Sequence, residues 1–240
     1  MINAIFLDMD ETLCATSLAD KRAGLIVASQ LGEQYPGLDA QHLVARYLQG
    51  IYKKLNDEFS GLVHLLPNER MFRAALLKAL FSEQGFTLSN DSLFELQDAF
   101  NQQRMQAFDF FPNVKALLNI LRADYQLVVI TNGPVFSQRP KLEAVEMHKW
   151  VDHIVVGGEE PEEKPAASIF HKALDLVNCT ADQVIHVGDS LTADVAGANA
   201  AGIQSVWVNP KPLHTTLEVV PNFCLSCVTE LPDLLLTLRK

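Results

Sequence analysis

The sequence predicts an α/β fold in which a doubly wound parallel sheet carries an inserted all-helical module. Short β-branched apolar runs alternate with helical segments in residues 1–8 and again from about residue 112 onward, which is typical of a parallel sheet with crossover helices. Between these two parts, the chain reads as helix after helix. At 240 residues and 48% hydrophobic content, the chain is long enough to bury a core domain and a second module.

Near-continuous apolar runs mark the strands of the predicted sheet. The first run ends at Asp8, and the later ones are YQLVVITNG, HIVVGG, QVIHVGD and IQSVWVN. Strands that are buried on both faces have this composition. Segments with apolar residues at helical spacing separate the later runs, so the second half has the order β-α-β-α-β-α-β of a Rossmann-like sheet. A further strand is predicted in NFCLSCVTEL near the end of the chain.

Four helices are predicted in the intervening module. The first ends at Pro36-Gly37, the second runs through AQHLVARYLQGIYKKLNDEF, the third spans Asn68 to Gly85, and the fourth begins near Ser89-Asn90. Because the module follows the first strand of the sheet, we expect an insertion that leaves and re-enters near the end of that strand. The predicted domains are a Rossmann-like core, residues 1–16 and 108–240, and a helical module, residues 17–107.

Charge and hydropathy bear on the partners of the chain. The formal net charge of -10 disfavours nucleic acid as a partner, because the phosphate backbone requires a basic surface. The start MINAIFLDMD lacks the basic and apolar regions of a secretory signal, and no stretch has the apolar length of a membrane helix. We therefore expect a soluble cytoplasmic protein with no membrane partner. The sequence does not indicate an oligomeric state.

Four cysteines are few for this length, so a disulfide framework is not expected. Cys224 and Cys227 form a C-x-x-C pair, but no second Cys or His pair has the spacing of a zinc site. We expect reduced cysteines in the core of the protein.

Polar side chains follow the predicted strands at the points where these strands end. Asp8 and Asp10 follow the first strand, Thr131 ends the second, Lys164 lies in the turn after HIVVGG, and Asp189 follows VIHVG. The carboxyl ends of parallel strands meet at one edge of a sheet, where open α/β sheets bind ligands. We therefore expect these five side chains in one site.

The expected site contains acids that require a cation. Asp8, Asp10 and Asp189 would repel one another in a partly desolvated pocket, and oxygen ligands suit Mg²⁺ better than zinc. Lys164 supplies a fixed positive charge. The Thr131 hydroxyl and the backbone amides around Met9, Asp10 and Asn132 can hold phosphate oxygens. The pattern therefore indicates a magnesium-dependent pocket for a phosphoryl group.

Four motifs occur together: DMDET at residues 8–12, TNG at 131–133, EEKPAASIF at 162–170 and GDSLTAD at 188–194. With them, the sequence resembles the haloacid dehalogenase superfamily of aspartate-nucleophile phosphatases. The helical module looks like the type 1 cap of this family, which determines substrate choice. More narrowly, VVGGEEPEEKPAASIF and TNG are similar to the N-acylneuraminate-9-phosphatases and their bacterial relatives, including pyrimidine 5'-nucleotidases.

The resemblance implies roles for these residues. Asp8 would attack phosphorus and become a transient aspartyl phosphate, while Asp10 would protonate the leaving oxygen and then activate water. Mg²⁺ would be held by Asp8, by the backbone carbonyl of Asp10 and by Asp189, and Asp194 would support the site through Lys164 or a metal-bound water. The implied substrate is a small phosphorylated metabolite: a sugar phosphate, a sialic acid phosphate or a nucleotide.

Three other functions are compatible with a similar fold: dehalogenase, phosphonatase and signalling module. Dehalogenases of the superfamily usually carry Tyr at the place of Asp10, so an acid there favours phosphate esters. Phosphonatases require a cap lysine, for which Lys21, Lys53, Lys54 and Lys78 are candidates, although solvated helix faces explain them adequately. A receiver-like signalling module that keeps a phosphoryl group on Asp8 would be about half this length and would lack the helical insertion.

Several other residues have simpler explanations. His186, inside the run VIHVG, is expected to be a hydrogen-bonded core residue. Arg139 and Lys141 follow Thr131 on a helix, and a solvated helix face explains them better than substrate contact. We expect Thr12 to brace the turn that follows the first strand. The apolar stripe in the helical module is interpreted as packing, and its members are Phe72, Leu76, Leu77 and Leu80.

Overall fold

The computed structural model describes residues 1–52, 54–55, 57–210 and 218–238, and the chain divides into two compact units. The first, which we call the core unit, comprises Met1–Thr16 and Phe108–Lys240. The second, which we call the helical unit, comprises Ser17–Ala107.

The described residues of the core unit form a six-stranded sheet in the order β3-β2-β1-β4-β5-β6, and every neighbouring pair is parallel. The strands are β1 (Ala4–Leu7), β2 (Gln126–Thr131), β3 (His153–Val156), β4 (Val184–Gly188), β5 (Gln204–Val208) and β6 (Phe223–Leu225). The chain winds from β1 to β3 in one direction and from β4 to β6 in the other. The predicted doubly wound α/β fold is confirmed, and its topological switch point lies between β1 and β4, where such sheets bind ligands.

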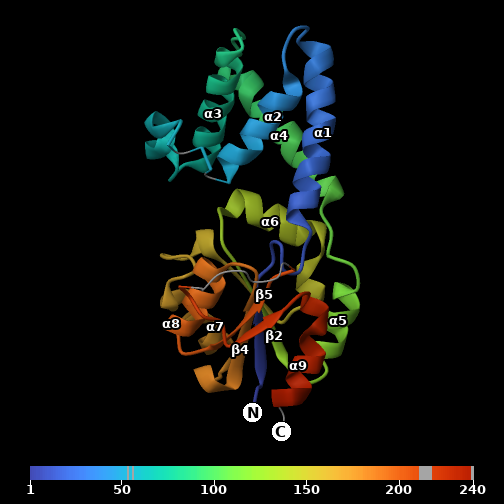
Figure 1. The fold of residues 1–240 in the computed structure, drawn as a ribbon, viewed down its shortest axis with the longest axis vertical. Helices are drawn as coiled ribbons and strands as arrows, with labels where there is room; N and C mark the ends of the chain where they lie inside the picture. Colours follow the sequence, from blue (N-terminus) through green and yellow to red (C-terminus); the bar gives the residue numbers. More distant parts are fainter. Residues whose placement is uncertain (53, 56, 211–217, 239–240) are drawn as a thin grey trace. The chain divides into compact units, whose positions relative to one another are not determined.

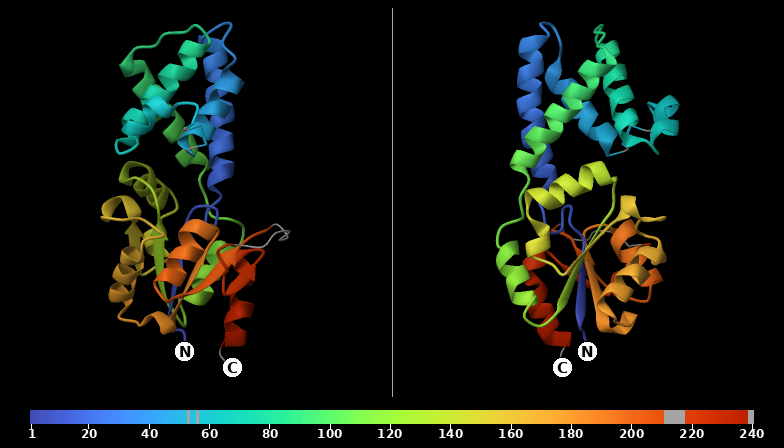
Figure 2. Two further views of the ribbon diagram at one scale, coloured as in Figure 1. Left: turned by 60° about the vertical axis from the view of Figure 1, so that its left-hand side comes forward. Right: turned by 180° about the vertical axis from the view of Figure 1, so that it is seen from behind.

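Helices cover both faces of this sheet. Helices α7 (Ala167–Val177) and α8 (Ala196–Ala200) lie on one side, and α5 (Val114–Leu121) and α9 (Leu231–Leu238) lie on the other (Figures 1 and 2). Helix α7 buries Ile169, Phe170, Ala173 and Val177, whose helical spacing places them on one face against Phe6 and Ile130 of the sheet. Helix α6 (Val135–Ala144) directly follows β2.

The two connections between the units are paired with each other. Residues 13–15 leave the end of β1 and lie beside residues 109–111, with the Ala15 amide donating to Asp109 O (3.1 Å) and the Phe111 amide donating to Leu13 O (2.9 Å). The helical unit is therefore an insertion that leaves and re-enters at the carboxyl end of β1, as the chain order predicts.

The helical unit contains the four predicted helices: α1 (Thr16–Gln34), α2 (Ala40–Ile51), α3 (Glu69–Glu83) and α4 (Asn90–Ala107). Asn68 caps α3, since its side chain accepts a hydrogen bond from the Met71 amide. The predicted apolar stripe of α3 is confirmed as packing, because it lies in the buried core of this unit.

The second helix is shorter than predicted. It ends at Ile51, and a 3-10 helix follows at Ser60–Leu65. The intervening sequence contains Asn and Asp, whose side chains favour turns over helix interiors, and Asp57 and Glu58 are exposed.

The cysteine prediction is wrong in part. All four cysteines are free, but only Cys14 is buried, Cys179 is partly buried, and Cys224 and Cys227 are exposed. The predicted late strand forms as β6, which lies at the edge of the sheet that the described residues form and pairs there with β5. Among the described residues, no helix combines the length and apolar character needed to cross a membrane.

Candidate active site

A cavity of about 140 Å³ lies at the carboxyl ends of β1, β2 and β4. Asp8 directly follows β1 and Asp189 directly follows β4, and these two strands are neighbours with Leu7 opposite Val187. Thr131 is the last residue of β2. The lining residues are Asp8, Asp10, Thr131, Asn132, Lys164, Asp189, Ser190, Ala193 and Asp194. The sheet thus brings together the five side chains that the sequence places at strand ends.

Lys164 is the buried cation of this cavity. Its Nζ donates to Asp8 Oδ1, to Asp194 Oδ1 and to the carbonyl oxygen of Ile130, each at 2.7 Å. Burial alone would lower the pKa of Lys164, but the carboxylates of Asp194 and Asp8 raise it above its ordinary value. The lysine is therefore a fixed positive charge whose three N–H groups hold it in one position.

Asp194 is the counter-ion that anchors Lys164. Its Oδ1 also contacts His186 Nε2 (2.9 Å), and its Oδ2 accepts from the Ser190 amide (3.0 Å). Although burial alone would raise the pKa of Asp194, Lys164 and the His186 hydrogen bond lower it below its usual range. A Cβ at Gly188 would lie 2.2 Å from Asp194 Cγ, so the glycine makes room for this carboxylate. His186 is a hydrogen-bonded core residue, as expected.

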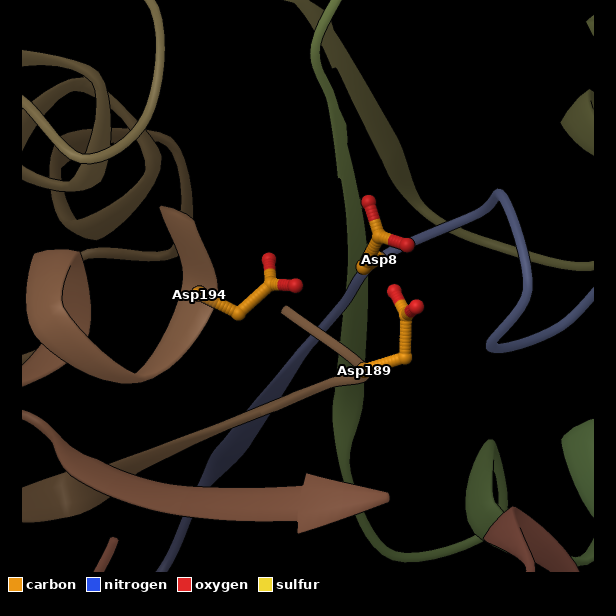
Figure 3. A group of neighbouring side chains, drawn as sticks. All are labelled: Asp8, Asp189 and Asp194. Atoms are coloured by element: carbon orange, nitrogen blue, oxygen red, sulfur yellow. The ribbon is translucent and has the colours of Figure 1, made fainter. Parts of the chain in front are cut away.

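Three carboxylates form a group that can hold a metal ion. One oxygen from each of Asp8, Asp189 and Asp194 lies within 4.8 Å of the others, and Figure 3 shows the three side chains around one space. Burial is the main cause that raises the pKa of Asp8 well above its ordinary value, with repulsion from Asp194 and Asp189 adding to it. Burial and the Asp194 carboxylate raise the pKa of Asp189 to about 7. A divalent cation among these oxygens would offset both effects.

Asp10 differs from these acids, because its carboxylate faces helix α6. Lys141 Nζ lies 3.0 Å from Asp10 Oδ1 and 2.9 Å from Oδ2, and Gln138 Nε2 donates to Oδ2 (3.2 Å). The Thr16 hydroxyl donates to Oδ1 (2.5 Å). The side-chain oxygens of Asp10 are thus fixed by residues on both sides of it. The family resemblance implies that the metal would bind its backbone carbonyl instead.

The expectation that Lys141 lies on a solvated helix face is wrong. Only 3% of its surface is exposed. Gln138 and Lys141 are three residues apart and therefore share one face of α6, and this face meets Asp10. Arg139 lies on another face, where it is partly exposed and pairs with Glu159. The spacing of Gln138 and Lys141 indicates that the two residues share a helix face, but it does not indicate that this face meets Asp10.

Thr131 carries a buried hydroxyl that is not satisfied within the described part of the chain. Its side chain is fully buried, and Oγ1 has no hydrogen-bond partner there. A buried hydroxyl without a hydrogen-bond partner destabilises the fold unless a ligand supplies the missing hydrogen bond. The Asn132 side chain, by contrast, is paired with the backbone of Lys164: Nδ2 donates to Lys164 O (2.7 Å), and Lys164 N donates to Oδ1 (2.9 Å).

Two further expectations concern Thr12 and the lysines of the helical unit. Thr12 is buried, but its Oγ1 has no hydrogen-bond partner among the residues that the structure describes, so it does not brace the turn through a hydrogen bond. Lys21 and Lys78 are exposed, as solvated helix residues are expected to be, and Lys54 is exposed in a turn that follows α2. Lys53 lies outside the described residues.

The chain is similar to known hydrolases. A family model described as haloacid dehalogenase-like hydrolase matches residues 2–202. The chain is similar to the N-acylneuraminate-9-phosphatase of Homo sapiens, with 32% identity over 239 residues that cover 98% of this chain and 94% of the relative.

Two solved structures are also similar to the chain. One is the HAD-hydrolase YfnB from Bacillus subtilis bound to magnesium, with a TM-score of 0.73, 20% identity and coverage of 98% of both chains. The other is a 2-haloacid dehalogenase from Pseudomonas syringae pv. Tomato DC3000, with a TM-score of 0.70, 26% identity and coverage of 99% of this chain and 100% of that chain. The likeness to the first, at this identity, shows the fold alone.

Proposed function

Because this chain belongs to the haloacid dehalogenase-like hydrolase family, we propose that it is a Mg²⁺-dependent phosphomonoesterase acting on a small phosphorylated metabolite. One observation supports this most strongly. The cavity that holds the buried Asp8–Lys164 ion pair also contains the fully buried hydroxyl of Thr131, which has no hydrogen-bond partner among the described residues. A nucleophilic carboxylate, a fixed cation and an open hydrogen-bond donor are the groups that bind and receive a phosphoryl group.

The proposed reaction has two steps. In the first, an Asp8 oxygen attacks phosphorus, the bond between phosphorus and the ester oxygen breaks, and Asp10 gives a proton to the departing alcohol. In the second, water attacks the aspartyl phosphate, Asp10 takes a proton from that water, and inorganic phosphate leaves with Asp8 restored. Lys164, the Thr131 hydroxyl and the amides near Met9 and Asn132 hold the phosphoryl oxygens in both steps.

The residues present fit a magnesium ion. The available donors are oxygens, and the raised pKa values of Asp8 and Asp189 indicate carboxylates whose repulsion a cation would relieve. Asp8, Asp189 and the backbone carbonyl of Asp10 would hold the ion. Asp194 is already bound to Lys164, His186 and Ser190, so we assign it to support rather than to direct coordination. Bound Mg²⁺ would supply positive charge to the phosphoryl oxygens.

The similarity to N-acylneuraminate-9-phosphatase supports the choice of substrates to test. We propose N-acylneuraminate 9-phosphate as the first compound to test, followed by sugar phosphates and pyrimidine nucleotides. We also propose that residues 17–107 act as the cap of this family.

A 2-haloacid dehalogenase activity is the second candidate, because one similar structure is such an enzyme. Its products differ from those of a phosphatase, so one assay separates the two. A phosphonatase would need a lysine that forms a Schiff base. Lys21, Lys54 and Lys78 are exposed side chains of the helical unit, and solvation explains them without this chemistry.

The test is a panel of phosphate esters incubated with the protein and Mg²⁺, with release of inorganic phosphate as the readout. A 2-haloacid is added to the panel with halide release as its readout. We expect phosphate release from at least one ester and none after Asp8→Asn. Halide release without phosphate release would favour the dehalogenase. A long-lived aspartyl phosphate without ester hydrolysis would favour the signalling module.

A further inference from the structure

We propose that Lys141 is a positioning residue that fixes the carboxyl group of Asp10 for proton transfer. This inference rests on the proposed function, since it assigns Asp10 to the departing alcohol and to the attacking water. It starts from the position of Lys141 on α6, ten residues after Thr131 in the sequence but in direct contact with the turn that follows β1.

The Lys141 ammonium group contacts both carboxylate oxygens of Asp10. Nζ lies 3.0 Å from Oδ1 and 2.9 Å from Oδ2, so the lysine restrains the rotation of the carboxyl plane as well as its distance. The lysine side chain is almost fully buried, whereas 27% of the Asp10 side chain is exposed. A surface ion pair would not require the burial of a lysine, which is costly without a partner.

Neighbouring residues hold the same arrangement. Gln138 Nε2 donates both to Asp10 Oδ2 (3.2 Å) and to the carbonyl oxygen of Asn132 (2.7 Å), so it ties Asp10 to the segment that follows Thr131. The Lys141 ammonium also lies 5.9 Å from the centre of the Phe108 ring. Gln138 and Lys141, which share one face of α6, therefore hold the Asp10 side chain close to the end of β2.

This arrangement has a consequence for catalysis. An acid or base that transfers a proton must lie within hydrogen-bond reach of its target, and small displacements lower the rate strongly. Without Lys141, the Asp10 carboxyl group would populate other rotamers. The loss should be confined to steps in which Asp10 transfers a proton, because Lys141 lines no part of the cavity that contains Asp8, Thr131 and Lys164.

A comparison of esters with different leaving groups separates proton transfer by Asp10 from the other steps of the reaction. An alkyl phosphate releases an alcohol that must be protonated, whereas p-nitrophenyl phosphate releases a stable anion that needs little proton donation. The ratio kcat/KM includes only the steps up to departure of the leaving group, so it reports the first half-reaction. The alkyl ester used is the primary-alcohol phosphate with the highest turnover in the panel.

The variants are Lys141→Met, Asp10→Asn and the double variant, with Lys141→Arg as the charge-conserving change and Lys172→Met as the matched control. Lys172 is half exposed, pairs with Glu160 and lies outside the cavity. Lys141→Gln replaces Lys141→Met if the latter does not fold. Each variant is first compared with wild type by thermal melting.

We expect Lys141→Met to lower kcat/KM for the alkyl ester by about 100-fold and that for p-nitrophenyl phosphate by less than about threefold. Lys141→Arg should recover part of the loss. The double variant should be no slower than Asp10→Asn, because Lys141 acts through Asp10. Equal losses for the two esters, or additive losses in the double variant, would overturn the inference while leaving the proposed function intact. No hydrolysis of any ester by the wild type would overturn both.

Discussion

Lys164 and Asp194 form an ion pair with 2.7 Å between Nζ and Oδ1, and both side chains are almost completely withdrawn from solvent. The pair joins the loop after β3 to the π-helix at Leu191–Val195, which follows β4. Two segments that are 30 residues apart are thereby fixed around the end of β1. The position of the buried cation relative to Asp8 depends on this contact.

Removing the charge of Asp194 should destabilise the core unit. We expect Asp194→Asn to lower the free energy of unfolding by about 3 kcal/mol, because it leaves the buried Lys164 with fewer carboxylate partners. Denaturation by urea, followed by tryptophan fluorescence, measures this effect, since Trp150 and Trp207 both lie in the core unit.

The matched control for Asp194→Asn is Asp109→Asn. It removes the exposed ion pair of Asp109 with Lys115 in the same unit, and we expect a change of less than about 1 kcal/mol. Equal changes in the two variants would contradict the special role of the Lys164–Asp194 pair.

Asp8→Asn should shift stability in the opposite direction. Burial and the neighbouring acids raise the pKa of Asp8, so above that pKa the ionised carboxylate destabilises the metal-free folded chain. The neutral amide removes this penalty, and we expect the melting temperature of metal-free protein at about pH 8 to rise by a few degrees. The same variant should show no turnover. A fall in melting temperature would show that the Lys164 contact outweighs the cost of burying the Asp8 charge.

Thr131→Val tests the unsatisfied hydroxyl. Valine has nearly the same shape, and removing a buried hydroxyl that has no partner in the described structure should not destabilise the fold. Binding of phosphate should weaken, because one donor to its oxygens is lost. We expect the inhibition constant of inorganic phosphate to rise about tenfold, with an unchanged melting temperature in its absence. A large loss of stability with unaltered inhibition would assign Thr131 a structural role.

Much of the core unit could be predicted because buried parallel strands leave continuous apolar runs. The order of these runs places Asp8, Thr131, Lys164 and Asp189 at carboxyl ends of strands, and a parallel sheet brings those ends to one edge. The order and direction of the strands are therefore enough to place these side chains near one another. For this reason, the sequence predicts most residues that line the cavity, but not Ser190 and Ala193.

Lys141 shows what the sequence could not specify. A lysine on a short helix has the same local pattern whether it is solvated or buried, and the outcome depends on which face of α6 meets the turn after β1. The exposure of Cys224 has a similar origin. The strand β6 is apolar enough to join the sheet, but its position at the edge, next to β5, depends on the order of the strands in the folded protein. Both features follow from tertiary contacts rather than from local preference.

The last prediction concerns the pH dependence of metal binding. In the metal-free protein, burial and the Asp194 carboxylate raise the pKa of Asp189 to about 7. A carboxyl group with a raised folded-state pKa stabilises the fold while it is protonated. This contribution is complete below its ordinary pKa and is lost as the pH rises through about 7. Mg²⁺ binds the ionised form, so the stabilisation that it provides should increase over the same interval.

We therefore expect Mg²⁺ to raise the melting temperature more at about pH 8 than at about pH 6, because the protons that compete for Asp189 are fewer. Asp189→Asn is the matched variant, since it keeps the shape of the side chain and removes both the charge and the titration. It should show a smaller Mg²⁺ effect with a weaker pH dependence, and the dependence that is left comes from Asp8, whose pKa is also raised. A wild-type shift that is equal at both pH values would mean that Asp189 does not change its protonation in this interval, and it would contradict the prediction.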